Sequence, residues 1–405
     1  MNEQHPSAGA VRAGWRGLPA SIWALGFGSL FMDMSSELVH SLLPLFLSTT
    51  LGAGMFAIGI LEGVAEATAA ITKVFSGALS DRLGRRKPLL IAGYGLAALS
   101  KPVFPLAGSI GWVFAARFVD RIGKGIRGAP RDALVADITP PSRRGAAYGL
   151  RQSLDSVGAF LGPLLAVALM LLLAGDMQAV LWIGVIPAVI AVILLWVAVR
   201  EPQAQATAEE RRRIPLRLAD MRGLPARYWW VVLLGGVFTL ARFSEAFLIL
   251  RAHDVGLGLS LAPLVMIVMS VIYAASALPA GIAADRISAR HLLFAGLLVL
   301  VAADVMLAVA TGPALVLVGA AVWGLHMGLT QGLLSKLVAD TAPAALRATG
   351  FGLFNLVSGG AMLLASLLAG FLWQQMGAAA TFIGGAVFAG LAACGLLVVG
   401  RNPRG

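Results

Sequence analysis

Long apolar runs, each about the length of a membrane-spanning helix, follow one another along almost the whole chain. A helix needs about 20 residues to cross the roughly 30 Å hydrocarbon layer of a bilayer. Twelve runs meet that length, and this pattern predicts an all-α polytopic membrane protein. The predicted spans are 20–48, 55–80, 88–107, 110–138, 147–173, 178–198, 228–252, 260–284, 292–311, 314–340, 349–374 and 379–400.

The composition excludes a single soluble core. Of the 405 residues, 59% are hydrophobic and only 13% are charged, against about 25% charged residues in ordinary soluble domains. The mean hydropathy of +0.85 extends over the full length. We therefore expect the lipid bilayer to be the main environment of the chain, in a bacterial-type inner membrane.

The basic residues between spans all lie in every second connection, which explains the net charge of +11. The opposite connections carry none apart from Arg251, at the end of its span. Positive residues concentrate on the cytoplasmic side of membrane proteins, so both termini are predicted to be cytoplasmic and no nucleic-acid partner is expected. These basic residues are Arg12, Arg16, Arg82, Arg85, Arg86, Lys87, Arg143, Arg144, Arg200, Arg211, Arg212, Arg213, Arg217, Arg222, Arg227, Arg286, Arg290, Arg347, Arg401 and Arg404.

One long polar connection, 200–227, divides the spans into two sets of six that look related. The segment GALSDRLGRR at 77–86 recurs as GIAADRISAR at 281–290, and 134–150 resembles 337–353 at nearly the same offset. Repeated halves are typical of transporters, with the substrate site at mid-membrane between them. The predicted parts are an N-terminal tail (1–19), an N-terminal six-helix bundle (20–199), a linker (200–227), a C-terminal six-helix bundle (228–400) and a C-terminal tail (401–405).

The segment GALSDRLGRRK at 77–87 resembles the signature of the major facilitator superfamily, and the resemblance covers nearly the whole chain. It implies twelve helices in two pseudo-symmetric six-helix bundles, a monomeric transporter, no enzymatic activity and no cofactor, with a proton gradient as the energy source. It also implies a gate at the cytoplasmic ends of the helices, where an acid can pair with a basic group or a helix N-terminus. The implied gate residues are Gly77, Asp81, Arg82, Gly84, Arg85, Arg86, Asp137, Asp285, Arg286 and Asp340.

Two further segments resemble motifs of proton-coupled antiporters, such as drug/H⁺ antiporters, in this superfamily. GAFLGP at 158–163 has small residues that let helices approach closely and a proline that bends the helix. RIGKG at 121–125 resembles a motif whose arginine is associated with proton coupling, which is Arg121 here, with Arg117 as a competing candidate.

Charged residues inside the spans are costly to bury and are candidates for function. At about 100° per residue, Asp33, Glu37 and His40 fall on one helical face. Burial and a like-charged neighbour both favour the protonated form of a carboxyl group. We therefore predict proton coupling at Asp33, Glu37, Glu66 and Arg121. In the alternative interpretation, arginines of the span 110–138 neutralise Asp33 and Glu37, and the two acids have only a structural role.

The resemblance also implies that the first, fourth, seventh and tenth spans line a central cavity. The predicted substrate-binding residues are Asp33, Glu37, His40, Lys124, Arg242, Glu245 and His326. The preferred interpretation is a secondary active transporter that exports a small cationic organic solute in exchange for protons. One alternative is a divalent transition-metal exporter, since Asp33, Glu37 and His40 offer oxygen and imidazole ligands. Another is an exporter of an anionic solute, such as a siderophore, held by Arg121, Lys124 and Arg242.

Overall fold

The computed structural model describes residues 17–83, 85–140, 143–201, 223–283, 287–343 and 346–399, and these residues form helices joined by short connections without any strand. The all-α prediction is confirmed. Helices of the first half are α1 (Ala20–Leu45), followed by a π-helical turn η3 (Phe46–Thr50), α2 (Met55–Leu83), α3 (Lys87–Ser100), α4 (Val103–Leu106), α5 (Ile110–Ile138), α6 (Arg144–Leu172), α7 (Met177–Ile183) and α8 (Val185–Ala198).

The second half repeats this organisation, and each predicted span corresponds to one helix or to two consecutive helices. Its helices are α9 (Ala226–Leu240), α10 (Ala246–Asp254), α11 (Leu264–Ala283), α12 (Ala289–Val309), α13 (Pro313–Thr341), α14 (Arg347–Met376) and α15 (Ala378–Val399). Among the described residues, 10 helical segments are long and apolar enough to cross a membrane. The two other predicted spans correspond to the charge-rich α5 and to the interrupted pair α9–α10.

The breaks within spans have local causes. Pro102 lacks an N–H donor and separates α3 from α4. Between α9 and α10, the residues 241–245 leave the helical path. Here the Ser244 Oγ accepts a hydrogen bond from the Ala246 N–H at 3.3 Å, and the Ser366 Oγ accepts one from the Ser244 N–H at 3.3 Å. These contacts satisfy backbone groups that a continuous helix would otherwise pair.

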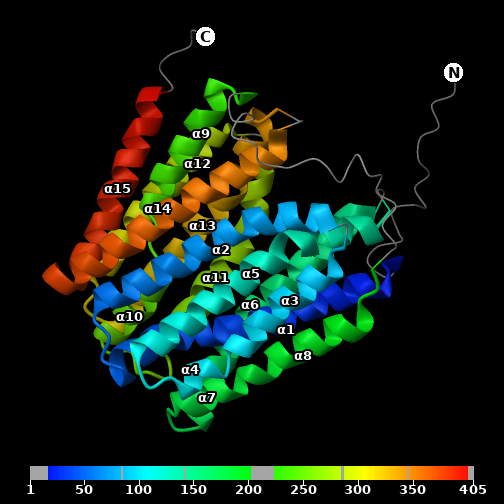
Figure 1. Ribbon diagram of the computed structural model, residues 1–405. Coiled ribbons are helices and arrows are strands. Elements are labelled where there is room, and N and C mark those ends of the chain that lie inside the picture. Colours follow the sequence, from blue (N-terminus) through cyan, green and yellow to red (C-terminus); the bar gives the residue numbers. More distant parts are fainter. Residues whose placement is uncertain are drawn as a thin grey trace.

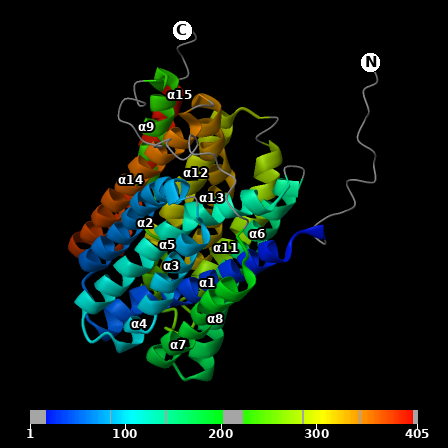
Figure 2. The same ribbon diagram turned by 45° about the vertical axis from the view of Figure 1, so that its right-hand side comes forward.

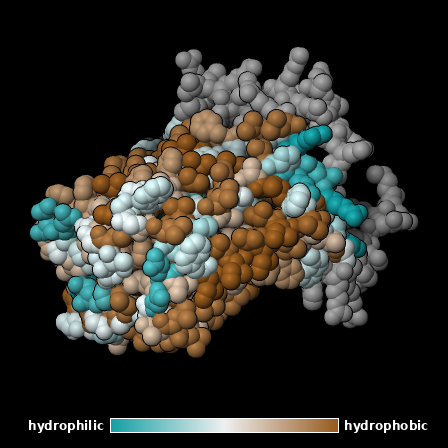
Figure 3. All heavy atoms as spheres, turned by 60° about the horizontal axis from the view of Figure 1, so that its bottom comes forward, coloured by the Kyte–Doolittle hydropathy of each residue, from teal (hydrophilic) through white to brown (hydrophobic). Residues whose placement is uncertain are grey.

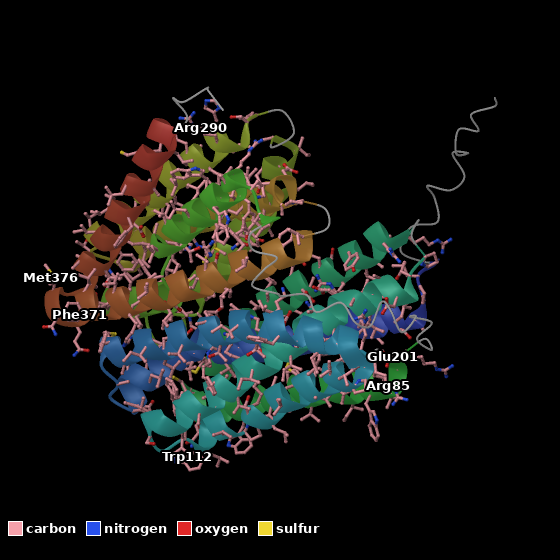
Figure 4. The ribbon with its side chains drawn as sticks, turned by 45° about the horizontal axis from the view of Figure 1, so that its top comes forward. Arg85, Trp112, Glu201, Arg290, Phe371 and Met376 are labelled. Atoms are coloured by element: carbon pink, nitrogen blue, oxygen red, sulfur yellow. The ribbon has the colours of Figure 1, made fainter. Side chains whose placement is uncertain are left out.

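The helices alternate in direction, so the bundle has two distinct ends. We call the end where α1, α3, α6, α9, α12 and α14 begin the basic end, and the other the opposite end. In Figure 4, Arg85 and Glu201 lie at the basic end of the first half and Arg290 at the basic end of the second, whereas Phe371 and Met376 lie towards the opposite end.

The two halves meet at the opposite end and separate toward the basic end. The end of α1 contacts α10 of the other half, whereas Figures 1 and 2 show the starts of α1 and α9 far apart. The buried apolar residues follow the same pattern. One cluster joins Leu42 and Phe46 of α1 and η3 to Phe247 and Leu250 of α10. At the basic end each half has its own cluster, around Ile22 in the first and Tyr228 in the second.

Helices α2 and α14 form a close antiparallel contact between the halves. A Cβ atom on Gly59 of α2 would clash with the backbone of Ser366 and Gly370 of α14. Nearer the basic end, a Cβ on Gly359 of α14 would lie 2.8 Å from the Cβ of Ala70 of α2. Small residues at such positions let helix backbones approach closely in a membrane protein. We call this contact the α2–α14 seam.

The outer surface is apolar, as a bilayer requires. Figure 3 shows a broad hydrophobic area across the middle of one face, with hydrophilic residues gathered toward its two sides. Large side chains such as Leu99, Leu172, Trp196 and Val197 are exposed. A contiguous apolar surface of this kind marks contact with lipid or protein, and together with the long apolar helices it makes this chain a multi-pass membrane protein.

Candidate functional site: a charged cavity between the halves

A cavity of about 590 Å³ lies between the two halves, in the middle of the bundle and the part nearer the basic end. A second cavity of about 190 Å³ continues it toward the opposite end, and the two share Glu37, Glu66, Lys124, Arg242 and Met362. The charged residues that line the larger cavity are Asp33, Glu37, Glu66, Lys73, Lys124, Arg127, Arg131, Asp155 and Arg242. The smaller one adds His40, Arg121 and Glu245.

On the side nearer the basic end, the acids of the cavity are paired with arginines of α5. The Arg127 Nη2 lies 3.2 Å from the Asp33 Oδ1, and the Arg127 guanidinium lies 4.5 Å from the centre of the Tyr94 ring. Arg131 lies 3.5 Å from Asp155, which also accepts a hydrogen bond from Arg151 at 2.6 Å. Charge pairing is the usual way to tolerate ions away from water, so these acids are already neutralised by the protein.

A second network surrounds Glu62 of α2, whose side chain is only 1% exposed. The Glu62 Oε2 accepts a hydrogen bond from the Arg117 Nη2 at 3.1 Å and lies 3.5 Å from the His40 Nε2. The His40 Nδ1 lies 3.3 Å from the Glu37 Oε2. From the other half, the Ser244 hydroxyl donates to the same Glu62 oxygen at 3.4 Å. This network therefore joins the halves on the side nearer the opposite end.

Glu66 of α2 and Asp120 of α5 are paired as well. The Arg121 Nη1 lies 3.0 Å from the Glu66 Oε1. The Lys101 Nζ lies 2.9 Å from the Asp120 Oδ1 and donates a hydrogen bond to the Ser36 hydroxyl at 3.0 Å. Arg121 is thus paired with Glu66 where it lines the smaller cavity.

Three cations that line the cavity have no acidic partner among the described residues. Lys73 of α2, Lys124 of α5 and Arg242 of the α9–α10 break make neither an ion pair nor a side-chain hydrogen bond there. The Arg242 Nε is buried without a hydrogen-bond partner. Glu245 is the one cavity acid in the described part of the chain that is likewise unpaired. The unpaired lining groups therefore carry an excess of positive charge.

Most of the predicted substrate-binding residues line these cavities, and His326 does not. Asp33, Glu37, Lys124 and Arg242 line the larger cavity, and His40 and Glu245 line the smaller. His326 is fully buried: its Nδ1 lies 2.8 Å from the Gly296 carbonyl oxygen and its ring stacks on Phe238 at 5.2 Å. Its place in the tenth span pointed to the cavity, but the side chain turns toward α12 instead.

The metal alternative finds little support in the geometry. Asp33 is held by Arg127, whereas Glu37 contacts His40, so the three predicted ligands do not converge. In the described part of the chain, no group of three His, Cys, Asp or Glu residues could hold a metal ion. The shared helical face of Asp33, Glu37 and His40 therefore does not predict a common metal site, because side chains of neighbouring helices determine which charged groups are in contact.

Part of the predicted gate lies within the described residues. The Arg86 Nε lies 2.6 Å from the Asp137 Oδ2, and the Arg86 Nη1 donates to the Ser80 hydroxyl at 3.0 Å. Arg85 and Asp340 are exposed, and a Cβ on Gly77 of α2 would lie 3.3 Å from the Cβ of Ala129 on α5. The side chains of Asp81 and Arg82, and the residues Gly84, Asp285 and Arg286, lie outside the described part of the chain.

Sequence reasoning missed several cavity residues. The sequence shows that Lys73 lies within a predicted span. It does not show that Lys73 lacks an acidic partner, because this depends on how α2 packs against other helices. Gln331 of α13 and Asn355 and Ser358 of α14 also line the cavity. The uncharged residues could have been found as polar positions at helical spacing within apolar spans.

This chain belongs to the Major Facilitator Superfamily, whose family model matches residues 25–250 and 245–405. It is 30% identical over 382 residues to an uncharacterized MFS-type transporter of Methanocaldococcus jannaschii, a match that covers 92% of this chain and 93% of that protein. It is 28% identical over 232 residues to the multidrug resistance protein MdtH of Edwardsiella ictaluri, covering 57% and 56%.

Solved structures agree on the fold. A variant of the nucleoside transporter NupG superposes with a TM-score of 0.79 at 13% identity, covering 93% of this chain and 99% of that one. A bacterial homologue of the human lysosomal transporter Spinster, in an inward-facing and unoccupied conformation, gives a TM-score of 0.75 at 16% identity, covering 94% and 96%. At these identities the similarity concerns the fold, and the chain is a multi-pass transporter of this superfamily.

Proposed function

We propose that this protein is a secondary active transporter that moves a small anionic solute by alternating access. The observation that carries the proposal is the set of unpaired cations, Lys73, Lys124 and Arg242, which line one cavity from both halves. Lys73 and Lys124 are exposed in this cavity and Arg242 is half-buried, so all three can reach a counter-charge that enters it. An anion bound between the halves supplies that counter-charge. Because it attracts cations of both halves, it would stabilise a conformation in which the halves close around it.

The same geometry disfavours the cationic cargo that the sequence suggested. A cation would need a free carboxylate, yet Asp33, Glu37, Glu66 and Asp155 already contact Arg127, His40, Arg121 and Arg151, respectively. Only Glu245 among the described cavity acids is available, and it lines the smaller cavity together with Arg242. The anionic alternative therefore has the better support, with Lys73 joining Lys124 and Arg242 in place of the paired Arg121.

The separation of the halves supports a state that is open toward the basic end. The positive-inside rule predicts that this end is cytoplasmic, so the cavity faces the cytoplasm in this proposal. The similarity to MdtH favours export, and we propose proton-coupled export as the working direction of transport. In this proposal the protein acts as a monomer in a bacterial-type inner membrane. It needs no cofactor, and the proton gradient drives transport.

The test uses the purified protein in proteoliposomes, with solutes of three classes added in turn. Radiolabelled phosphate, glucose 6-phosphate and citrate represent anions, tetraphenylphosphonium represents organic cations, and Mn²⁺ represents divalent metals. We expect transport of at least one anion and of neither cation. Arg242→Gln should abolish anion transport, whereas Arg227→Gln, an exposed arginine at the start of α9, should leave it unchanged. Transport of the organic cation or of Mn²⁺ by the wild-type protein, without any anion, would refute the proposal.

A further inference from the structure

Asp304 of α12 is buried in the C-terminal half without any partner for its charge. Its exposed fraction is 0%, and neither carboxylate oxygen has a hydrogen-bond partner in the described part of the chain. Removing an ionised carboxylate from water without a cation or hydrogen-bond donor costs so much free energy that the group is neutralised instead. The protonated acid is the form that this environment accepts.

The surroundings of Asp304 are apolar or aromatic. If Gly385 of α15 carried a Cβ, that atom would lie 2.7 Å from the Asp304 Oδ2 and 3.0 Å from the Phe243 Cε1, so both side chains lie beside Gly385. The Phe243 ring centre lies 5.3 Å from that of Trp323 on α13, whose Nε1 is also buried without a hydrogen-bond partner.

No charged side chain neutralises Asp304 from the helices packed around it. On α13, the His326 Nδ1 contacts the Gly296 carbonyl oxygen, eight residues before Asp304 on α12, and its Nε2 has no partner. On α15, Cys394 is exposed. On α10, the Arg251 guanidinium donates to the α12 carbonyl oxygen of Leu307 and to those of Ala308 and Ala310, and pairs with Asp254 instead of Asp304. Arg242, next to Phe243 in the chain, lines the cavity.

The other buried acids of the described chain differ from Asp304 in having cations beside them. Glu62 contacts Arg117, and Asp120 contacts Lys101. A fixed opposite charge favours the ionised form of an acid, so these groups are poor proton carriers. Asp304 needs a bound proton in the present conformation, and it would lose that proton only after a cation or water reached it.

The α9–α10 break connects Asp304 with the cavity. Arg242 and Phe243 are consecutive residues of this non-helical segment. Both line the smaller cavity, and Phe243 also packs against Trp323 and lies, like Asp304, beside Gly385. A residue outside regular helix can change its backbone angles with less loss of hydrogen bonds than one inside it. Movement of Arg242 toward a solute would therefore also move the Phe243 ring, which lies beside Gly385 as Asp304 does.

We propose that Asp304 is a proton-binding site of this transporter and that the α9–α10 break couples its protonation to solute binding at Arg242. The coupling rests on the proposed anion transport, whereas the proton site does not. This assignment differs from the predicted sites Asp33, Glu37 and Glu66, since each of those acids has a basic partner.

The proton site is tested by infrared spectroscopy of the full-length protein in lipid, without any solute. We expect the wild-type protein to show the carbonyl stretching band of a buried protonated carboxyl group at neutral pH. Asp304→Asn should remove this band, and Asp340→Asn, a matched change at an exposed acid of α13, should retain it. Should Asp304→Asn fail to fold, Asp304→Glu should shift the band. A spectrum that neither Asp304 variant changes would overturn the proton site.

The coupling is tested in proteoliposomes with phosphate, glucose 6-phosphate and citrate. We expect the wild-type protein to accumulate at least one of them when a pH gradient is imposed. Asp304→Asn should lose accumulation driven by the gradient but retain exchange of labelled for unlabelled anion, a split that misfolding would not produce. Gradient-driven accumulation by Asp304→Asn at the wild-type level would overturn the coupling. If the wild-type protein moves none of these anions, the proposed function fails, and the infrared comparison alone decides the proton site.

Discussion

The two halves of the molecule share one architecture but treat buried charge in opposite ways. In the first half, the buried acids are paired, as Glu62 is with Arg117 and Asp120 with Lys101. In the described part of the second half, the inner charges Arg242, Glu245 and Asp304 have no ion pair, and the one pair found there, Arg251–Asp254, lies at the opposite end. Paired charges fix the positions of helices, whereas unpaired charges remain available to a solute or a proton.

This contrast predicts that substitutions of the buried paired groups mainly change stability and that substitutions of unpaired groups, including Lys73 and Lys124 of the first half, mainly change binding. The largest effect is expected for Arg117→Met. It would leave Glu62 buried with only His40 and Ser244 in contact. Removal of one partner of a buried pair costs about 3–5 kcal/mol, measured as the free energy of unfolding in detergent. The double variant Arg117→Met, Glu62→Leu should recover much of the lost stability. If Arg117→Met alone is as stable as the wild type, the buried pairs of the first half do not have the stabilising role assigned to them.

The next effect concerns an unpaired cation of the cavity. Lys124→Gln should weaken anion binding, because a hydrogen bond to a charged group contributes about 1.5–3 kcal/mol, or roughly 10- to 100-fold in affinity. Its free energy of unfolding should change little, since Lys124 has no partner in the described structure. Equilibrium binding of the transported anion and unfolding of the same sample measure both quantities. A large loss of stability with unchanged anion affinity would show that the unpaired Lys124 stabilises the fold and does not bind the solute.

A smaller effect of the opposite sign is expected at Glu245. This unpaired acid shares the smaller cavity with Arg242, so its negative charge opposes a bound anion. Glu245→Gln should therefore strengthen anion binding by roughly two- to tenfold, as expected for one charge removed at moderate distance. Weaker anion binding in this variant would indicate instead that Glu245 contacts a positively charged part of the solute.

The smallest effect is expected for a paired but half-exposed acid at the basic end. The Asp137 side chain is 44% exposed and contacts Arg86. Solvent-exposed ion pairs contribute less than about 1 kcal/mol, so Asp137→Asn should change the free energy of unfolding by no more than that. A loss of unfolding free energy as large as that of Arg117→Met would show that solvent exposure does not distinguish weak ion pairs from strong ones in this protein.

The sequence predicted the fold well because the spans are long and apolar, and length and hydropathy are local properties. All twelve predicted spans correspond to helices with boundaries close to those expected. The α9–α10 break was missed, because residues 241–245 contain neither Gly nor Pro and the break is stabilised by contacts with Ser366 and Glu62 from other helices.

The site was harder to predict than the fold. Periodicity correctly placed Asp33 and Lys124 on inward-facing surfaces, but it could not show that Arg127 neutralises Asp33 while Lys124 stays free. Such pairing depends on the rotation and depth of two helices that are distant in sequence. His326 illustrates the same limit, since its ring turns toward Phe238 and Gly296 and away from the cavity.

The α2–α14 seam has a mechanical consequence. Because the glycine and alanine backbones of Gly59, Ala70, Gly359 and Gly370 interlock along the helix length, sliding of one half past the other would disrupt many contacts at once. Tilting about the seam would disturb fewer. We therefore expect the halves to move mainly by rotation about the α2–α14 seam. Such a rotation would keep this side of the pathway closed to the acyl chains, and a charged solute would have no lateral leak into the lipid there.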